Sequence, residues 1–225
     1  MKIAELFYSI QGEGELTGIP SVFVRTSGCN LRCRWCDTKY AWDSEGDEIG
    51  VPELLKRVDA FPTRFCVLTG GEPMMAEEIR DLAEQLVTAG KHVTIETAGT
   101  VLPESIACSL ASLSPKLTNS TPGGDWRDRH ESLRLQLDVV REWVDGYDYQ
   151  LKFVVSEDGD VQEVLDLLNQ LERDVPSEKV LLMPEGRETE VIQRKSDVIV
   201  EACKEHGFRF CNRLHVQLWN NERGR

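Results

Sequence analysis

Three cysteines stand close together in a spacing that is typical of metal ligands. Cys29, Cys33 and Cys36 follow a C-x3-C-x2-C pattern within residues 29–36. Thiolates are soft ligands that suit iron–sulfur clusters and zinc, and so short a loop can aim three sulfurs at one point. Three thiolates on a four-iron cluster leave one iron free for a non-protein ligand, which favours catalysis over electron storage. The alternative is a structural zinc site whose fourth ligand lies elsewhere in the chain.

This segment resembles the signature of the radical S-adenosylmethionine (SAM) superfamily, in which an aromatic residue, here Trp35, precedes the last cysteine. A second motif, Gly70-Gly71-Glu72-Pro73, follows an apolar run and strengthens the resemblance. Its glycines let the backbone approach a ligand closely, and Glu72 offers an acceptor for the amino group of SAM. The resemblance implies a 4Fe–4S cluster whose open iron binds SAM, and cleavage of SAM to a 5′-deoxyadenosyl radical that abstracts hydrogen from substrate.

Further segments narrow the resemblance to one family. These segments are Gln11-Gly12-Glu13-Gly14, Phe23-Val24-Arg25-Thr26-Ser27-Gly28-Cys29, Cys36-Asp37-Thr38, Glu96-Thr97-Ala98-Gly99-Thr100, Ser114-Pro115-Lys116 and His215-Val216-Gln217-Leu218-Trp219. Together they resemble the 7-carboxy-7-deazaguanine synthase family over nearly the whole chain. The resemblance implies conversion of 6-carboxy-5,6,7,8-tetrahydropterin to 7-carboxy-7-deazaguanine and ammonia by a radical ring contraction that regenerates SAM. This reaction belongs to the biosynthesis of queuosine and related deazapurine nucleosides of tRNA.

The resemblance also assigns residues to the substrate, which carries a carboxylate and an amino-pyrimidine edge. Arg25, at the end of an expected strand, can form a fork to the carboxylate. Glu13 and Glu96 can accept hydrogen bonds from the pyrimidine N–H groups, with further bonds from Gln11 and Thr69. The full set of expected substrate contacts is Ile10, Gln11, Gly12, Glu13, Arg25, Thr69, Glu96 and His215.

A second set of residues is expected at the cofactors. The three cysteines are the expected ligands of the 4Fe–4S cluster, and the hydroxyl of Thr38 is a candidate ligand of Mg²⁺, a hard cation that keeps several waters. No side chain is assigned as a catalytic acid or base, because the radical comes from SAM. The expected SAM contacts are Trp35, Asp37, Gly70, Gly71, Glu72, Ser114, Pro115 and Lys116.

Several of these side chains also have an ordinary structural explanation. Arg25 can form an ion pair at the edge of the core, and Thr38 can cap a turn or a helix. His215 lies in an apolar segment that we expect to be a strand, where a histidine is commonly a core residue with satisfied hydrogen bonds. Glu13 and Lys116 can be solvated charges. The sequence leaves both explanations open for each of them.

Two segments depart from the family pattern. Relatives often carry a Gln-Pro-Met segment near the penultimate strand, where this chain has Leu182-Met183-Pro184-Glu185-Gly186, so the adenine contacts around Met183–Glu185 stay open. The segment 219–225 ends in Arg225, a cation, and the role of a terminal carboxylate in substrate binding stays open as well.

Alternating strand-like and helical segments must position these side chains. Strands are predicted at residues 3–8, 21–25, 65–69, 92–96, 150–155, 180–183 and 208–218, with a further strand ending at 113–116. Helices are predicted at 52–58, 79–87, 103–110, 133–144, 161–171 and 191–203, with a polar, mobile loop at 119–129. Roughly six parallel strands are too few for a complete eight-stranded barrel. The expected fold is α/β, a partial (β/α)6-type TIM-like barrel with a radical SAM core, as a single domain over residues 1–225.

The composition restricts the partners and the compartment. The formal net charge of −13 argues against a nucleic-acid surface, because phosphate binding requires concentrated Lys and Arg. No apolar run is long enough to cross a membrane, and the N-terminus lacks the apolar stretch of a signal peptide, so we expect a cytoplasmic protein. Cys66, Cys108, Cys203 and Cys211 are scattered through apolar segments, which indicates small buried side chains rather than a disulfide framework.

Two other functions agree with part of these observations. An activating enzyme that makes a glycyl radical on a partner protein would share the radical SAM motifs but would need no pterin pocket. A zinc-stabilised binding protein would explain the thiols but would give the Gly-Gly-Glu-Pro motif no role. For the synthase, the resemblance implies a small pterin substrate, an electron donor such as flavodoxin, and a homodimer.

Overall fold

One nine-stranded sheet organises the computed structural model, which describes residues 1–43, 45–220 and 222–224. Arg225 lies outside the described residues, and with it the terminal carboxylate whose role in substrate binding the sequence left open. Ser44 and Asn221 lie outside them as well. The strands are β1 (Lys2–Ile10), β2 (Pro20–Thr26), β3 (Asp47–Glu48), β4 (Phe65–Gly70), β5 (His92–Thr97), β6 (Leu110–Leu113), β7 (Tyr149–Val155), β8 (Val180–Pro184) and β9 (Arg209–Phe210). They lie in the order β3-β1-β2-β4-β5-β6-β7-β8-β9.

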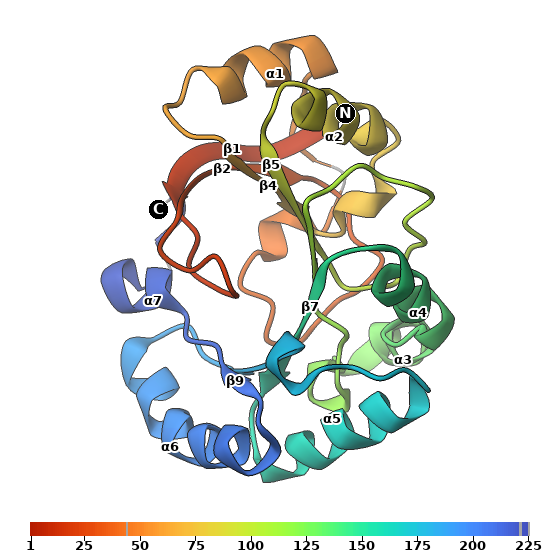
Figure 1. Cartoon of the computed structure of the whole chain (residues 1–225), viewed down its shortest axis with the longest axis vertical. Coiled ribbons are helices and arrows are strands. Elements are labelled where there is room, and N and C mark those ends of the chain that lie inside the picture. Colours follow the sequence, from red (N-terminus) through yellow and green to blue (C-terminus); the bar gives the residue numbers. More distant parts are fainter. Residues whose placement is uncertain (44, 221, 225) are drawn as a thin grey trace.

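Helices cover the outside of this sheet. They are α1 (Val51–Asp59), α2 (Ile79–Thr88), α3 (Arg127–Leu133), α4 (Leu137–Gly146), α5 (Asp158–Gln170), α6 (Thr189–His206) and α7 (Leu214–Trp219), with short 3-10 helices η1 (Lys39–Ala41), η2 (Pro73–Met75), η3 (Thr118–Ser120), η4 (Gly124–Trp126) and η5 (Ser177–Lys179). Figure 1 shows α1, α2, α4, α5 and α6 around the periphery. In the described part of the chain, no helix is both long and apolar enough to span a membrane.

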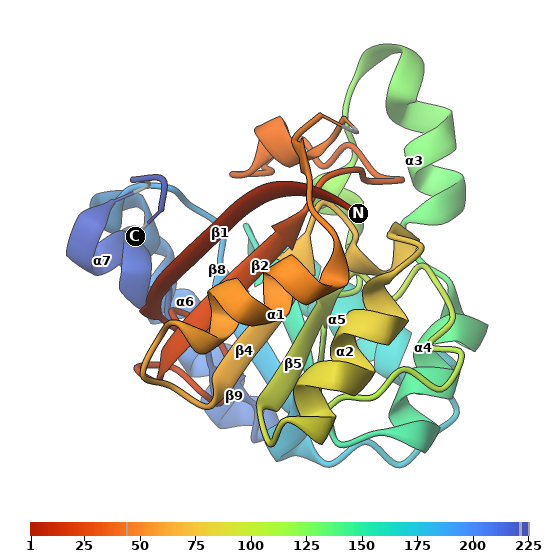
Figure 2. The same cartoon turned by 90° about the horizontal axis from the view of Figure 1, so that it is seen from above.

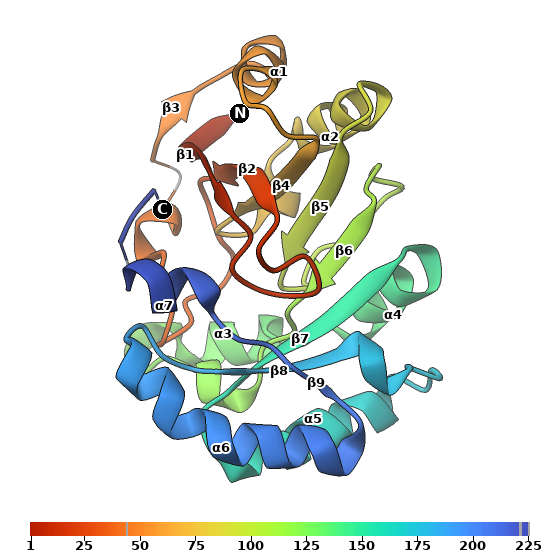
Figure 3. The same ribbon diagram turned by 60° about the vertical axis from the view of Figure 1, so that its left-hand side comes forward.

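Parallel pairing dominates the sheet. Neighbouring strands from β2 to β9 run parallel, whereas β1 pairs antiparallel with β2 and β3. Figure 3 shows the strands following a curve from β1 to β9, with α5 and α6 outside it. The sheet has two ends, β3 and β9, and so it stays open. The partial TIM-like barrel predicted from the sequence is therefore confirmed.

Side chains alternate between the two faces of the parallel strands, because successive residues of a strand point in opposite directions. Alternate positions face the helices and form the main core: Val22, Val24, Cys66, Leu68, Val93, Ile95, Ala111, Leu113, Leu151 and Phe153. The positions between them face the interior of the barrel, and at the carboxyl ends they are polar: Arg25, Thr69, Glu96, Ser112 and Lys152. One apolar face thus holds the helices, while the other presents polar groups to a ligand.

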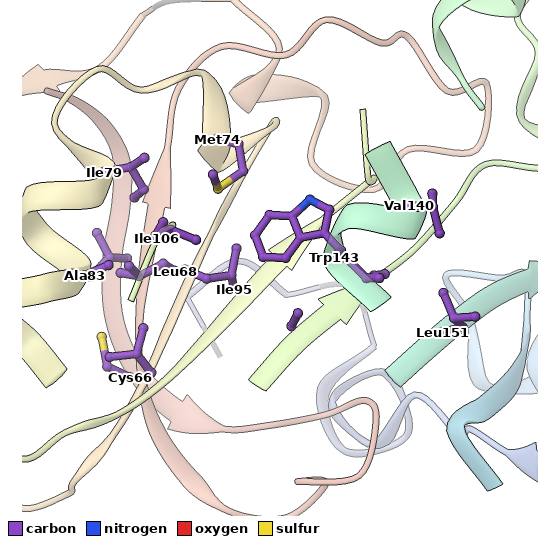
Figure 4. Close-up of a cluster of buried hydrophobic side chains, with 14 of the residues drawn as sticks. Cys66, Leu68, Met74, Ile79, Ala83, Ile95, Ile106, Val140, Trp143 and Leu151 are labelled. Atoms are coloured by element: carbon purple, nitrogen blue, oxygen red, sulfur yellow. The ribbon is translucent and has the colours of Figure 1, made fainter. Parts of the chain in front are cut away.

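Trp143 of α4 lies in the main core. Its side chain is completely buried, and its indole N–H donates to the carbonyl of Val101 over 3.1 Å. Figure 4 shows the indole beside Ile95 of β5 and Met74 of η2. A buried indole with a satisfied N–H ties α4 to the loop that follows β5.

The cysteines outside residues 29–36 lie in apolar surroundings, as predicted. Cys66 and Cys203 belong to the main core, and Cys108 is half-buried against it. Cys211 lies in a smaller apolar cluster on the inner face of β7 and β8. The described cysteines are all free thiols.

Three local predictions are wrong. The helix predicted at 103–110 is a turn, since Glu104 and Ser105 have positive φ angles of 46° and 61°, which an α-helix does not contain. The strand predicted at 208–218 is only the short β9, followed by α7. Because β9 is the last strand of the sheet, the chain beyond it finds no further strand, and Gln217 N–H bonds to the Arg213 carbonyl instead.

The third correction concerns residues 119–144. The loop predicted at 119–129 ends earlier, because α3 begins at Arg127. The helix predicted at 133–144 is interrupted after Leu133 and resumes as α4. The apolar spacing applies only to α4, which buries Val140 and Trp143 against the sheet. Figure 2 shows α3 standing out from the rest of the molecule, beside the segment that carries the three predicted ligand cysteines.

Candidate active site

A cavity of about 210 Å³ lies at the carboxyl ends of β2, β4 and β5. It is lined by all the residues predicted to contact substrate, namely Ile10, Gln11, Gly12, Glu13, Arg25, Thr69, Glu96 and His215, together with Phe7, Phe23, Asp37, Thr38 and Gly70. We call it the substrate cavity. The fold brings together residues from β1, three parallel strands and α7, at the strand ends where barrel enzymes bind ligands.

Hydrogen bonds order the polar wall of the substrate cavity. The Gln11 amide donates to Glu96 over 3.1 Å, and its carbonyl oxygen accepts from the backbone N–H of Glu13, also over 3.1 Å. Gln11 is buried and links the end of β5 to the loop after β1. Two carboxylates that can accept N–H groups of a ligand are thereby held on one wall.

Glu13 is the most strongly paired carboxylate of the site. It accepts from Lys152 Nζ over 2.5 Å and from Arg213 Nε over 2.9 Å. Burial alone would raise the pKa of Glu13, but the two cations lower it well below its ordinary range. The pKa of Lys152, which burial would lower, is raised instead by Glu13 and other acidic neighbours. Glu13 is therefore a fixed anion rather than the solvated charge considered above.

The sequence left open whether Arg25 contacts substrate or forms an ion pair, and the structure places it where it can do both. Its Nε donates to Glu5 over 3.1 Å, which is the ion pair, and the residue also lines the substrate cavity. Glu5 receives hydrogen bonds from Tyr40 and Arg223 as well. The carboxylate therefore fixes the guanidinium from behind, in a position where a ligand carboxylate can reach it.

His215 reaches the substrate cavity from α7 rather than from a strand. Its Nε2 lies 4.0 Å from a Glu13 oxygen, and burial lowers its pKa. Gly12 is needed beneath it, since a Cβ at position 12 would lie 2.1 Å from His215 Nδ1. The backbone N–H of Leu214 also donates to the Gly12 carbonyl over 2.9 Å. The close contact of α7 with the β1–β2 loop thus places the imidazole.

A second cavity, of about 170 Å³, adjoins the first and contains the three thiols. We call it the cofactor cavity. Its walls include Cys29, Cys33, Cys36, Trp35, Asp37, Thr38, Gly70, Gly71, Ser114, Lys116 and Lys152. Burial raises the pKa of Cys29 to about 11 and that of Cys33 to about 12, so a bound cluster has to displace their protons. Three thiols on one side of a shared cavity fit a 4Fe–4S cluster that keeps one iron open for SAM.

The Gly-Gly-Glu-Pro motif forms the floor beneath this loop. A Cβ at Gly71 would lie 2.4 Å from the Gly28 carbonyl and 2.6 Å from Cys29 Cβ. Glu72 is buried and accepts from Thr97 Oγ1, Ala98 N and Met74 N over 2.7–3.2 Å. Its carboxylate therefore braces η2 against the end of β5, and it does not line either cavity; its contact with SAM stays a prediction.

Lys116 and Trp35 face each other across the cofactor cavity. Lys116 Nζ donates to Ser114 Oγ over 2.9 Å and lies 5.8 Å from the centre of the Trp35 ring. Burial lowers the pKa of Lys116. Trp35 is held by its indole N–H, which donates to Asn119 over 3.0 Å. Lys116 is thus a half-buried wall residue rather than a solvated strand end, while the intervening Pro115 lines neither cavity.

The loop of the three cysteines is anchored to α3 by His130. The completely buried imidazole accepts the backbone N–H of Arg32 at Nδ1 over 3.2 Å, and its Nε2 lies 2.9 Å from Ser120 Oγ. Ser120 in turn donates to Leu117 and accepts from Arg34 N through its carbonyl. The exposed helix α3 therefore has a structural task, which is to hold the ligand loop in place.

His130→Ala is expected to loosen this loop. Removing the imidazole leaves the Arg32 N–H without its acceptor and the Ser120 hydroxyl with only its bond to the Leu117 carbonyl, which costs about 1–3 kcal/mol locally. Iron should then be lost to a chelator about fivefold faster or more, because 1–2 kcal/mol corresponds to about 5–30-fold in an opening equilibrium. His206→Ala, on α6, serves as the control. Equal rates of iron release in the two variants would exclude this role of His130.

A third, smaller cavity of about 130 Å³ lies beyond Trp35. It is lined by the segment that departs from the family pattern, Met183, Pro184, Glu185 and Gly186, together with Glu13, Trp35, Asp37, Ser114, Lys152, Val154 and Arg213. This segment, which differs from the family pattern, therefore adjoins the cofactor cavity, as an adenine contact would require.

Sequence reasoning missed four polar residues of the site: Asn119, His130, Lys152 and Arg213. Lys152 carries a detectable signal, because it is a lone charge within the apolar run of β7. Arg213 and His130 carry none, since both gain their roles only through long-range contacts.

The chain is similar to known proteins over most of its length. The model of the Radical SAM superfamily matches residues 23–173. The 7-carboxy-7-deazaguanine synthase of Halobacterium salinarum is 40% identical to this chain, covering 98% of the chain and 91% of that relative. The 7-carboxy-7-deazaguanine synthase of Rhodopirellula baltica is 42% identical to this chain, covering 99% of the chain and 88% of that relative.

A comparison of this fold with solved structures identifies the same kind of protein. The crystal structure of QueE from Escherichia coli superposes with a TM-score of 0.72 and 25% identity, covering 95% of this chain and 94% of that one. The superfamily model also spans most of the chain. Since similar relatives align from end to end, this chain belongs to the 7-carboxy-7-deazaguanine synthase family of radical SAM enzymes.

Proposed function

We propose that the chain converts 6-carboxy-5,6,7,8-tetrahydropterin to 7-carboxy-7-deazaguanine and ammonia. The observation that carries the proposal is the shared wall of the two cavities. Asp37, Thr38, Thr69, Gly70 and Glu96 line both of them, so a ligand in the substrate cavity would lie directly beside SAM.

In this proposal the side chains bind and orient the reactants. Arg25, fixed by Glu5, would bind the pterin carboxylate, and Glu13 and Glu96 would accept the pyrimidine N–H groups. Lys152 keeps Glu13 ionised and so maintains its acceptor strength. Cys29, Cys33 and Cys36 would hold the cluster, which together with SAM would supply the radical chemistry. The main contribution of the protein is to hold the reacting atoms of substrate and SAM close together and correctly oriented.

The proposal includes Mg²⁺ at Thr38, next to the substrate carboxylate. Thr38 stands at the N-terminus of η1 but its side chain makes no capping hydrogen bond, and it lies 3.6 Å from Cys36 Sγ. Its hydroxyl thus stays available to a hard cation that otherwise keeps water ligands. A flavodoxin-type electron donor, a homodimer and a cytoplasmic location complete the proposal on the basis of the family alone.

The test is an anaerobic assay of the protein reconstituted with iron and sulfide. The reduced enzyme is incubated with SAM and 6-carboxytetrahydropterin, with and without Mg²⁺, and the products are followed by mass spectrometry. We expect a brown protein that forms the deazaguanine without net consumption of SAM, and more slowly without Mg²⁺. Slow cleavage of SAM without a deazapurine would favour a glycyl-radical activating enzyme. A colourless protein that retains zinc would contradict the cluster.

A further inference from the structure

Arg213 lies between Glu13, which lines the substrate cavity but not the cofactor cavity, and Asp37, which lines both. Its Nε donates to Glu13, over 2.9 Å, and its Nη2 donates to Asp37. Its Nη1 donates to the carbonyl of Gly186, so each nitrogen of the guanidinium has a partner. Arg213 is 7% exposed and lines neither the substrate cavity nor the cofactor cavity. It lines the third cavity together with Glu13 and Asp37, and it acts on ligands in the other two cavities through these two carboxylates.

The two carboxylates have distinct tasks. Glu13 is an expected substrate contact, and its second oxygen is paired with Lys152 over 2.5 Å. Asp37 directly follows the last cysteine of the ligand loop and is an expected contact of SAM. A single planar group thus holds both Glu13 of the substrate cavity and Asp37 of the wall that the two cavities share.

This geometry has an energetic consequence. The guanidinium is rigid and its hydrogen bonds to Glu13 and Asp37 have a fixed relative direction. A ligand that immobilises one carboxylate also immobilises Arg213, and with it the other carboxylate. The second ligand then binds to a site that is already ordered, and loses less conformational entropy.

We propose that Arg213 is a positioning residue that couples the two cavities, so that pterin substrate and SAM bind with positive cooperativity. The inference rests on the proposed function, since it takes these two molecules as the ligands. By linkage the coupling is reciprocal: each ligand strengthens the binding of the other by the same factor. Arg213 thereby fixes the distance between the reacting parts of the two molecules.

The test measures this factor directly, without turnover. The reconstituted enzyme is kept oxidised, with no reductant, and titrated calorimetrically with SAM in the absence and presence of saturating 6-carboxytetrahydropterin. In the unmodified protein we expect the Kd for SAM to fall about tenfold when the pterin is present, which corresponds to ~1.4 kcal/mol.

Two substitutions test the role of Arg213. Arg213→Lys keeps the buried charge but lacks the fork, and we expect the coupling factor to fall close to 1 while the iron content stays unchanged. Arg213→Met should lose the coupling as well and should weaken both affinities. Arg173→Met is the control, because Arg173 is paired with Asp145 at an exposed site, and it should keep the full factor.

The outcomes separate the two levels of the proposal. A coupling factor that is unchanged in Arg213→Lys would overturn the inference, and so would its absence from the unmodified protein, even if the synthase reaction proceeds. Failure of the unmodified protein to bind the pterin at all would overturn the proposed function and the inference together.

Discussion

Gly71→Ala is expected to prevent cluster assembly and to reduce the synthase reaction at least about 100-fold. The added Cβ would lie 2.4 Å from the Gly28 carbonyl, 2.6 Å from the Ala41 carbonyl and 2.6 Å from Cys29 Cβ. None of these atoms is the end of a flexible side chain, so the ligand loop itself has to move. Overpacking of this kind costs about 1–3 kcal/mol, and here the strain acts on a ligand cysteine.

The loop has little freedom to absorb this displacement. Gly28 N–H donates to the Ala41 carbonyl and Glu72 N–H donates to the Gly28 carbonyl, both over 2.9 Å. Iron and sulfide content, the visible spectrum and the rate of product formation measure the effect. Gly123→Ala is a matched control, because no atom lies within 4 Å of a Cβ at that position. Normal iron content in Gly71→Ala would show that the loop tolerates the shift.

Cys33→Ala is expected to abolish product formation. It removes one of three thiolates from a cluster that has no other cysteine ligand among the described residues lining the cavity. Loss of an outer-shell partner already costs roughly 10–100-fold in metal affinity or activity, and loss of a direct ligand costs more. We expect the reconstituted variant to lack the brown colour and the electron paramagnetic resonance signal of a reduced 4Fe–4S cluster.

A second buried thiol provides the comparison. Cys33 and Cys203 are 7% and 5% exposed, but Cys203 packs in the main core, far along the chain from the ligand loop. Cys203→Ala should cost about 1 kcal/mol of unfolding free energy and leave iron content and turnover unchanged. If Cys33→Ala retained a full cluster and normal turnover, the assignment of the ligands would be wrong.

The sequence predicted the barrel because its strands and helices depend on local signals, whereas the family resemblance supplied both sets of expected ligand contacts. Apolar runs followed by glycine, as in Leu68-Thr69-Gly70-Gly71, mark the carboxyl end of a strand. Motifs at such ends must meet at one edge of a parallel sheet, and so Arg25 and Glu96 share the substrate cavity. Alternation along strands would also have identified Lys152, which takes an inward position in β7.

Other parts of the site follow from contacts that no local pattern encodes. Arg213 and His215 belong to a segment that reads as a strand, and they reach the site only because β9 ends the sheet and α7 folds back onto Gly12. His130 lies on an exposed polar helix, and no sequence pattern there indicates that a residue holds the loop of the three cysteines. The choice between iron–sulfur cluster and zinc was likewise settled by family membership, not by the spacing of three cysteines.

The contact of α7 with the loop after β1 makes the site depend on both ends of the chain. Leu214, Arg213 and Cys211 bond to Gly12, Glu13 and Gly14, which are synthesised first. During synthesis, the strands β1 to β8 and the three thiols leave the ribosome before the residues around 213 do. A chain interrupted after β8 would therefore have the ligand cysteines but lack Arg213, the shared partner of Glu13 and Asp37.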